Sequence, residues 1–191
     1  MSTGVAQGQL YKFRLKSENA HGFSTEWSDL GSIYADDKPD KVSMVTTTVE
    51  SQTYVRIEWT EPYDGSSAIT HYEVLIKEKD GDYSTDSASC DGSDPSLTHC
   101  DVPMQTLRAE PFNLEQGDIV VAIVRAVNAN GEGAYSEPNS VGVEIEVEPA
   151  QMEAPVRGSG TTETQIELSW TTIEGLSTGG ASIDSYNLKW D

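Results

Sequence analysis

The chain has 191 residues, in which 12 lysines and arginines face 32 aspartates and glutamates, giving a formal net charge of −20. Nucleic-acid binding requires clustered basic side chains, so this balance argues against a nucleic-acid partner. No apolar run approaches the ~20 residues of a membrane span, and the first eight residues are too small and polar for a signal peptide. The composition therefore favours a well-solvated acidic surface with no membrane span in this segment.

The first predicted element is a strand bounded by two glycines. Residues 8–22 contain a turn glycine, a strand of period two, Asn19 and a closing glycine. Residues 117–131 repeat this pattern about 109 residues later. Recurrence at such a spacing indicates a tandem array of small β-sandwich modules.

The middle of the chain contains the predicted strands of one whole sandwich. The expected strands are 42–49, 54–60, 70–78, a polar strand or loop at 83–88, 97–102, 118–128 and 140–147, with a turn of helix within 107–114. Because strand side chains alternate between faces, Trp59 on the second strand and Tyr72 on the third are expected to point inward. Seven strands in two sheets are normal for a sandwich of about 100 residues.

The last predicted strands repeat two from the middle. Residues 166–170 match 55–59, each ending in a tryptophan, and Tyr186 follows the second copy as Tyr72 follows the first. Within one module the tryptophan strand should precede the strand that ends in Asn and Gly. The order of the copies therefore predicts three units: the back part of a module in 1–37, a complete module in 38–148 and the front part of another in 149–191.

These motifs resemble the fibronectin type III family. That family carries a Trp on its second strand and a Tyr on its third, and its sixth strand reads Leu-x-x-Gly-x-x-Tyr-x-x-x-Val-x-Ala-x-Asn-x-x-Gly before a Ser-rich turn. The matching residues are Trp59, Tyr72, Leu114, Gly117, Val124, Ala126, Asn128, Gly131 and Ser136 in the middle, Gly8, Tyr11, Leu15, Asn19, Gly22 and Ser28 in the leading segment, and Trp170 and Tyr186 in the trailing one.

The resemblance implies an all-β fold of tandem immunoglobulin-like sandwiches, one complete and two partial. It implies core positions for Tyr11, Trp59, Tyr72, Trp170 and Tyr186. Val120 stands where the family has a tyrosine, so the middle module lacks that hydroxyl. Residues 100–113 also resemble variant repeats of very large surface proteins of protists.

The two cysteines, Cys90 and Cys100, lie in one turn-rich stretch of the middle module. Their even number and local spacing favour a disulfide worth about 2–3 kcal/mol and an oxidising, extracellular or cell-surface location. The alternative is two free thiols in a cytosolic array of the muscle type. Zinc is not expected, because no second Cys or His pair lies near.

One apolar patch is predicted on the outer face of a sheet. Leu75 on the third strand and Val121 and Ile123 on the sixth alternate out of the core, and these strands pair in this fold. An exposed apolar patch marks a contact surface more often than chance. Either another chain or module or a flanking loop is expected to cover it.

Catalysis has little support in the sequence. None of His21, His71 and His99 occurs in a catalytic motif, and no phosphate-binding Gly-rich loop or Gly-x-Ser-x-Gly elbow is present. We expect no enzyme activity, no cofactor and no metal. Acidic runs at 36–40 and 144–148 could supply calcium ligands, but solvated linkers are the simpler expectation.

Two classes of function remain: a structural or adhesive array, such as a spacer or filament at a cell surface, and a module that recognises a ligand or receptor through its loops or apolar sheet face. The expected partner is protein, either further copies of the chain or neighbouring modules. The partial modules could join head to tail as a homo-polymer, or these residues could be a window on one long polypeptide.

Overall fold

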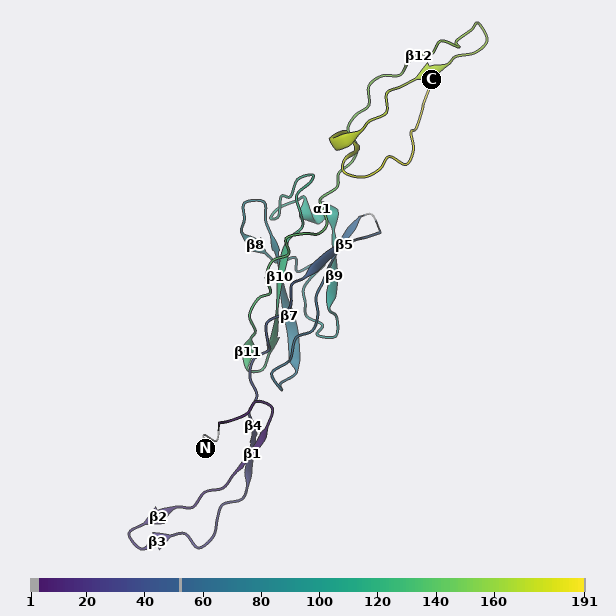
Figure 1. Ribbon diagram of the computed structural model, residues 1–191. Coiled ribbons are helices and arrows are strands. Elements are labelled where there is room, and N and C mark those ends of the chain that lie inside the picture. Colours follow the sequence, from purple (N-terminus) through teal and green to yellow (C-terminus); the bar gives the residue numbers. More distant parts are fainter. Residues whose placement is uncertain (1–3, 52, 191) are drawn as a thin grey trace.

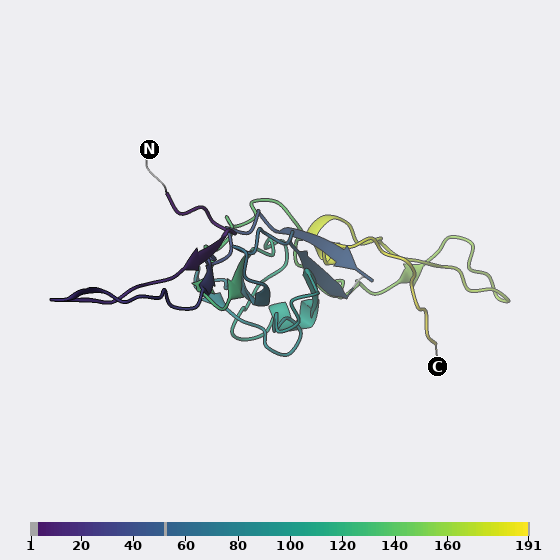
Figure 2. The same ribbon diagram turned by 90° about the horizontal axis from the view of Figure 1, so that it is seen from below.

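The computed structural model describes residues 4–51 and 53–190. A central β-sandwich carries an arm at each end, and the arms extend in opposite directions (Figures 1 and 2). We call residues 4–36 the leading arm and residues 149–190 the trailing arm.

The elements are β1 (Leu10–Phe13), β2 (Glu18–Asn19), β3 (Gly22–Phe23), β4 (Gly31–Tyr34), β5 (Thr46–Glu50), β6 (Tyr54–Glu58), β7 (Ile69–Lys77), β8 (Tyr83–Ser84), β9 (His99–Pro103), α1 (Met104–Leu107), β10 (Ala122–Asn128), β11 (Gly131–Glu132), β12 (Val156–Arg157), β13 (Leu168–Ser169) and the 3₁₀ turn η1 (Gly175–Thr178).

The central sandwich consists of two antiparallel sheets. One has the order β5-β6-β9 and the other β11-β10-β7-β8. In the second sheet Ala126 lies opposite Tyr72, and Ile123 lies opposite Leu75. The alternation of buried and half-buried residues along β7 and β10 follows from this pairing, since successive side chains point to opposite faces.

The hydrophobic core lies between these two sheets. Trp59 and Tyr72 pack with ring centroids 5.2 Å apart. Val120, which stands where the family has a tyrosine, is fully buried. Its isopropyl group adds to the core instead of a hydroxyl that would need a hydrogen-bond partner.

The last predicted strand, 140–147, does not form as a regular strand. Only an isolated bridge between Ile119 and Glu144 remains, and β10 begins at Ala122, later than expected. The buried side chain of Asn139 explains the interruption. Its Oδ1 accepts from the Ala122 N–H at 2.8 Å and its Nδ2 donates to the Val120 carbonyl at 2.9 Å, so a side chain replaces part of the backbone ladder.

The helical turn also lies earlier than predicted. α1 ends at Leu107, where the expected turn began. Met104 and Leu107 are buried, and the Met104 N–H donates to the Thr53 carbonyl at 2.8 Å, which anchors the turn beside β6. Residues 108–114 form turns that bury Phe112 in the core.

The leading arm has the same hydrogen-bond pattern as the hairpin that ends the central sandwich. β1 pairs with β4 and β2 with β3. The matched bonds are Gly8 N to Ala35 O (2.7 Å) and Gly117 N to Ile145 O (3.0 Å), and Leu15 N to Ser28 Oγ (3.0 Å) and Val124 N to Ser136 Oγ (3.1 Å). The repeated sequence pattern thus folds in the same local register twice.

The trailing arm matches the opening of the central sandwich. β12 pairs with β13, and Trp170 and Tyr186 pack with ring centroids 5.9 Å apart, close to the separation of Trp59 and Tyr72. Trp170, Tyr186 and Tyr11, which were expected as core residues, are not fully buried in the described part of the chain. Trp170 is 41% and Tyr186 38% exposed, and Tyr11 is half-buried, because no second sheet packs on either arm within the described residues.

Candidate interaction surfaces

The outer face of the four-stranded sheet carries the predicted apolar patch. Leu75 lies opposite Ile123, and the Lys77 N–H donates to the Val121 carbonyl at 2.9 Å, which places Val121 beside them. All three patch residues are half-buried, while their neighbours along each strand point into the core. We call Leu75, Val121 and Ile123 the sheet patch.

A polar network borders the sheet patch. Arg125 Nε donates to Glu73 Oε2 at 2.7 Å, the Tyr135 hydroxyl donates to the same oxygen at 2.9 Å, and Arg125 also contacts Glu132 Oε2 at 2.5 Å. The guanidinium lies 4.5 Å from the centroid of the Tyr135 ring, a cation–π distance. The network gives one end of the patch a fixed, directional polar border.

These contacts shift the pKa values of the network. Burial alone would raise the pKa of Glu73, but hydrogen bonds from Arg125 and Tyr135 outweigh it and hold that pKa below its ordinary value. Burial alone would lower the pKa of Arg125, but its bond to Glu73 and the nearby carboxylates raise it. Both side chains therefore stay charged at neutral pH and hold the border together.

The disulfide loop lies at the edge of the same sandwich. Cys90 and Cys100 are joined by a disulfide with their Cα atoms 5.1 Å apart. Inside the loop Asp91 and Asp94 each accept a backbone N–H two residues on, from Ser93 at 3.1 Å and Ser96 at 2.9 Å. The hydroxyl and N–H of Ser96 lower the pKa of Asp94, and the N–H and hydroxyl of Ser93 lower the pKa of Asp91. The backbone bonds are the turn-forming bonds typical of Asp.

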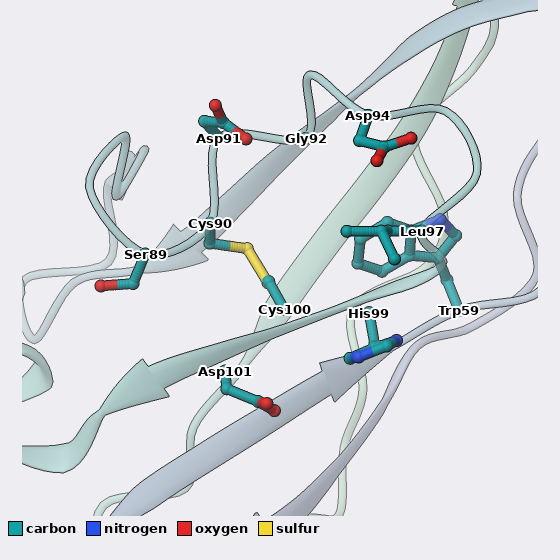
Figure 3. Close-up of a pocket in the computed structure, with 10 residues that line it drawn as sticks. All are labelled: Trp59, Ser89, Cys90, Asp91, Gly92, Asp94, Leu97, His99, Cys100 and Asp101. Atoms are coloured by element: carbon teal, nitrogen blue, oxygen red, sulfur yellow. A yellow bond between two sulfur atoms is a disulfide. The ribbon is translucent and has the colours of Figure 1, made fainter.

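A cavity of about 310 Å³ opens beside the disulfide (Figure 3). Asp91 and Asp94 line it from the loop, His99 from β9, and Trp59 and Leu97 from its apolar side. The carboxylates of Asp91 and Asp94 already accept the hydrogen bonds that form the turns of the loop. Asp101, which also lines the cavity, is held by both Arg56 Nε at 2.7 Å and Arg56 Nη2 at 2.8 Å.

In the described part of the chain, Cys100 and His99 form no nucleophile–base pair, and the acidic residues form no metal-binding cluster. Cys100 is in the disulfide, so its sulfur is not a free nucleophile beside His99. Within residues 4–51 and 53–190, no three His, Cys, Asp or Glu side chains are placed to hold a metal ion. No helix in that part of the chain has the length and hydropathy to cross a membrane.

The arms present apolar side chains to solvent that match buried ones in the central sandwich. Leu15 is 70% exposed, whereas its counterpart Val124 is fully buried. Trp170 is 41% exposed and its counterpart Trp59 only 5%. The large exposed apolar side chains include Leu10, Phe13, Leu15, Phe23, Trp27, Leu30, Ile33 and Tyr34 on the leading arm and Val156, Ile166, Leu168, Trp170, Leu176, Tyr186, Leu188 and Trp190 on the trailing arm.

A hydrogen-bonded junction around Asn128, which was not predicted from the sequence, fixes the start of the central sandwich. The Nδ2 group of buried Asn128 donates to the carbonyls of Asp37 at 2.8 Å, Asp64 at 2.8 Å and Ser67 at 3.1 Å. The Asp37 N–H in turn donates to the Gly65 carbonyl at 2.9 Å. The only sequence signal was the recurrence of Asn in both copies of the strand pattern, at Asn19 and Asn128.

A comparison with protein-family models matches the central sandwich. A sequence model described as fibronectin type III domain matches residues 37–141, more than half of the chain. Among solved structures, the twitchin kinase region from C. elegans is 20% identical over 54% of this chain, with a TM-score of 0.40, and a structure of the titin kinase and its flanking domains is 25% identical over 56%, also with a TM-score of 0.40. The matches cover 16% and 17% of those longer chains. On the strength of the domain match, this chain belongs to the fibronectin type III family.

Proposed function

We propose that this chain is a structural segment of a tandem fibronectin type III array, acting as a spacer or filament-forming component at a cell surface or in extracellular material. Fibronectin type III domains are generally non-catalytic. The observation that carries the proposal is the pair of arms, each folded in the local register of one part of the central sandwich and each with its apolar face exposed.

Each arm needs a partner to bury that face. An isolated two-stranded hairpin is marginally stable in water, and apolar surface gains about 25 cal/mol per Å² on burial. Because the arms point away from each other, they cannot cover one another within one chain (Figures 1 and 2). Units joined arm to arm would extend lengthwise, which suits a spacer or filament.

The disulfide supports the location. Structural disulfides form and persist in oxidising compartments, and the Cys90–Cys100 bond ties a loop to β9 in the sandwich core. Large surface proteins of the kind the sequence resembles are a fitting context. The acidic charge of −20 would keep such an array dispersed.

A recognition module is the second candidate, and the sheet patch with its polar border favours it. Leu75, Val121 and Ile123 form an apolar centre, and the Arg125–Glu73 pair supplies a directional rim. This combination of apolar centre and polar rim is the usual anatomy of a protein interface. A protein ligand, rather than a small molecule, fits such a flat face.

Imaging of the native particle tests the proposed function. We expect an elongated particle or filament with the period of one sandwich. Mass measurement of the denatured material then distinguishes separate subunits near 20.8 kDa from one much heavier polypeptide. A compact monomer at high concentration, together with saturable binding of a soluble ligand to the sheet patch, would instead establish the recognition module.

A further inference from the structure

We propose that the two linkers flanking the central sandwich are rigid, and that each holds its arm at one fixed orientation to the sandwich. We call residues 35–37 the leading linker and residues 145–147 the trailing linker. The inference rests on the proposed array function only for its consequence, because both linkers lie within this chain. It goes beyond that function, since a spacer can equally be built from modules on flexible linkers.

The leading linker has a single residue between its anchor on the arm and its anchor on the sandwich. The Ala35 N–H donates to the Gln9 carbonyl at 2.9 Å, and the Ala35 carbonyl accepts from the Gly8 N–H at 2.7 Å, so Ala35 is bonded twice to the leading arm. Two residues later, the Asp37 N–H donates to the Gly65 carbonyl of the central sandwich at 2.9 Å. The linker therefore has almost no slack.

The trailing linker has the same set of bonds. The Ile145 N–H donates to the Asp118 carbonyl at 2.9 Å, and the Ile145 carbonyl accepts from the Gly117 N–H at 3.0 Å, both within the central sandwich. Two residues later, the Val147 N–H donates to the Gly179 carbonyl of the trailing arm at 2.7 Å. Again one residue separates the two anchors, so the second arm is tied in the same way as the first.

A further bond follows each linker and prevents rotation about a single contact. The Asp40 N–H donates to the Tyr63 carbonyl at 2.9 Å, and the Ala150 N–H donates to the Ser177 carbonyl at 2.8 Å. In both places the donor stands three residues after the linker's last residue, and the acceptor stands two residues before the glycine. The chain therefore runs alongside the loop over two bonds.

A buried glycine makes each of these contacts close. Gly65 and Gly179 have φ values of +72° and +83°, and both are buried. An added Cβ would lie 2.2 Å from the Asp37 carbonyl oxygen at the first and 2.0 Å from the Val147 carbonyl oxygen at the second. Gly179 is buried on an arm whose other described residues are half-buried or exposed. Linker and loop thus fit together without space for a side chain.

Side-chain contacts around the trailing linker add to the backbone bonds. The Gln116 Nε2 group donates across the linker to the Leu176 carbonyl at 2.9 Å, and Arg108 Nη1 donates to Glu148 Oε2 at 3.0 Å. The side chain of Val147 packs against the core of the central sandwich, while its N–H bonds to the arm. One residue of the linker therefore contacts both bodies at once.

The leading linker has different side chains around it. An added Cβ at Gly8 would lie 2.7 Å from Ser66 Oγ and 3.5 Å from the Tyr63 hydroxyl, so the arm approaches the sandwich loop closely at this point. At Gly117, the matching position of the central sandwich, nothing lies within 4 Å of an added Cβ. The two linkers share their backbone bonds but not their surroundings, which allows each arm its own fixed direction.

A hinge needs a few residues that can absorb changes in φ and ψ. Each linker offers only one residue between its anchors, Asp36 or Glu146, and one residue has two soft backbone dihedrals. Relative motion is the default for domains joined by an exposed linker that few contacts cross, but backbone bonds cross both of these linkers. Repeated along an array, such linkers would give a rod of defined shape.

The first test measures distances in the spin-labelled 191-residue chain by pulsed electron spin resonance. One label pair spans the trailing linker, Gln105→Cys with Glu163→Cys, and the other lies within the trailing arm, Glu153→Cys with Glu163→Cys; all three positions are exposed. We expect equally narrow distance distributions for both pairs. A broader distribution across the linker than within the arm would overturn the rigid linker. Broad distributions in both pairs would overturn it too, because the arm would then not hold the loop that anchors the linker.

The second test uses two glycines of one loop. Gly179→Ala should broaden the distribution across the linker about twofold or more, because the new Cβ displaces the linker, and should leave the pair within the arm unchanged. Gly175→Ala is the matched control, since Gly175 has a φ of +61° but nothing within 4 Å of an added Cβ, and it should leave both distributions narrow. Equal effects of the two variants would overturn the glycine contact as the cause of rigidity.

A Gly-Ser-Gly insertion after Glu146 gives the width expected of a flexible linker. A wild-type distribution as broad as that of the insertion variant would overturn the rigid linkers and leave the array function to the imaging of native material. A compact native particle would instead overturn the array function, while a narrow distribution would still establish the rigid linker in this chain. The two failures are therefore distinguishable.

Discussion

The Tyr72 N–H donates to the Gly92 carbonyl at 2.9 Å, so the disulfide loop caps the free edge of β7. Gly92 has a φ of +66°, and a Cβ there would lie 2.1 Å from the Tyr72 carbonyl oxygen. The loop therefore approaches the strand so closely that only glycine fits. Figure 3 shows Gly92 between Asp91 and Asp94 in this loop.

Gly92→Ala should destabilise the central sandwich by more than about 2 kcal/mol, because it combines backbone strain with a steric clash. Gly81→Ala is the matched control, since Gly81 has a φ of +105° with nothing within 4 Å of an added Cβ. It should cost only the backbone term, about 1 kcal/mol. Urea unfolding followed by tryptophan fluorescence gives both values, and equal costs would contradict the close approach.

Removal of the disulfide should lower the free energy of unfolding by about 2–3 kcal/mol, because the bond restricts the unfolded chain. The Cys90→Ala, Cys100→Ala double variant and the reduced wild-type protein should behave alike in thermal unfolding. Thiol labelling of unreduced, denatured protein should find no free thiol. Two labelled cysteines would remove both the bond and the main support for an oxidising compartment.

Ile123→Lys should weaken assembly or ligand binding through the sheet patch about tenfold or more without unfolding the sandwich. The residue is half-buried and the leading arm already has Arg14 at the matching position, so the fold tolerates a basic side chain there. Val124→Lys, one residue on and fully buried, should abolish folding. Sedimentation and circular dichroism separate the two effects, and loss of folding in both variants would mean that the strand faces the other way.

The Glu73–Arg125–Tyr135 network should make stability depend on pH in the acid range. The folded-state pKa of Glu73 lies below its ordinary value of 4.5. Its contribution is therefore fully present above that value and is lost as the pH falls through the lower folded-state pKa. Because the carboxylate is about one-third exposed, the effect should be small, at most about 1 kcal/mol.

The measurement is the urea midpoint between pH 6 and pH 2.5, compared in wild type and Glu73→Gln. The variant should lose part of the acid-range slope. Glu163→Gln, a change on the exposed trailing arm, should keep the wild-type slope. Identical slopes in all three proteins would show that Glu73 titrates as an ordinary surface carboxylate.

The sequence was sufficient to predict the central strands that have a clear apolar alternation. Val55, Ile57 and Trp59 on β6 are separated by polar residues, so the period of two was visible without tertiary information. The cysteine pair was similarly predictable because it is local. The resemblance to fibronectin type III repeats then assigned the order of the strands.

Long-range side-chain bonds were not predictable in this way. The Asn139 amide replaces backbone ladder bonds beside β10, and the hydropathy of 140–147 gives no sign of it. Likewise, Asn128 reaches carbonyls 61 to 91 positions away, so its role appears only when the opening and closing segments meet. A repeated Asn marked the position but not the bonds it makes.

The interruption at Asn139 also limits how these chains can aggregate. Without a regular last strand beside them, β10 and the residues before it would offer neighbours a row of free backbone N–H and C=O groups, a template for sideways sheet growth. Here the Asn139 side chain occupies the Ala122 N–H and the Val120 carbonyl, and the Ser136 hydroxyl accepts from the Val124 N–H. Lateral fusion of sandwiches into amyloid-like sheets is thereby discouraged at this edge, even in a crowded assembly that is free to lengthen.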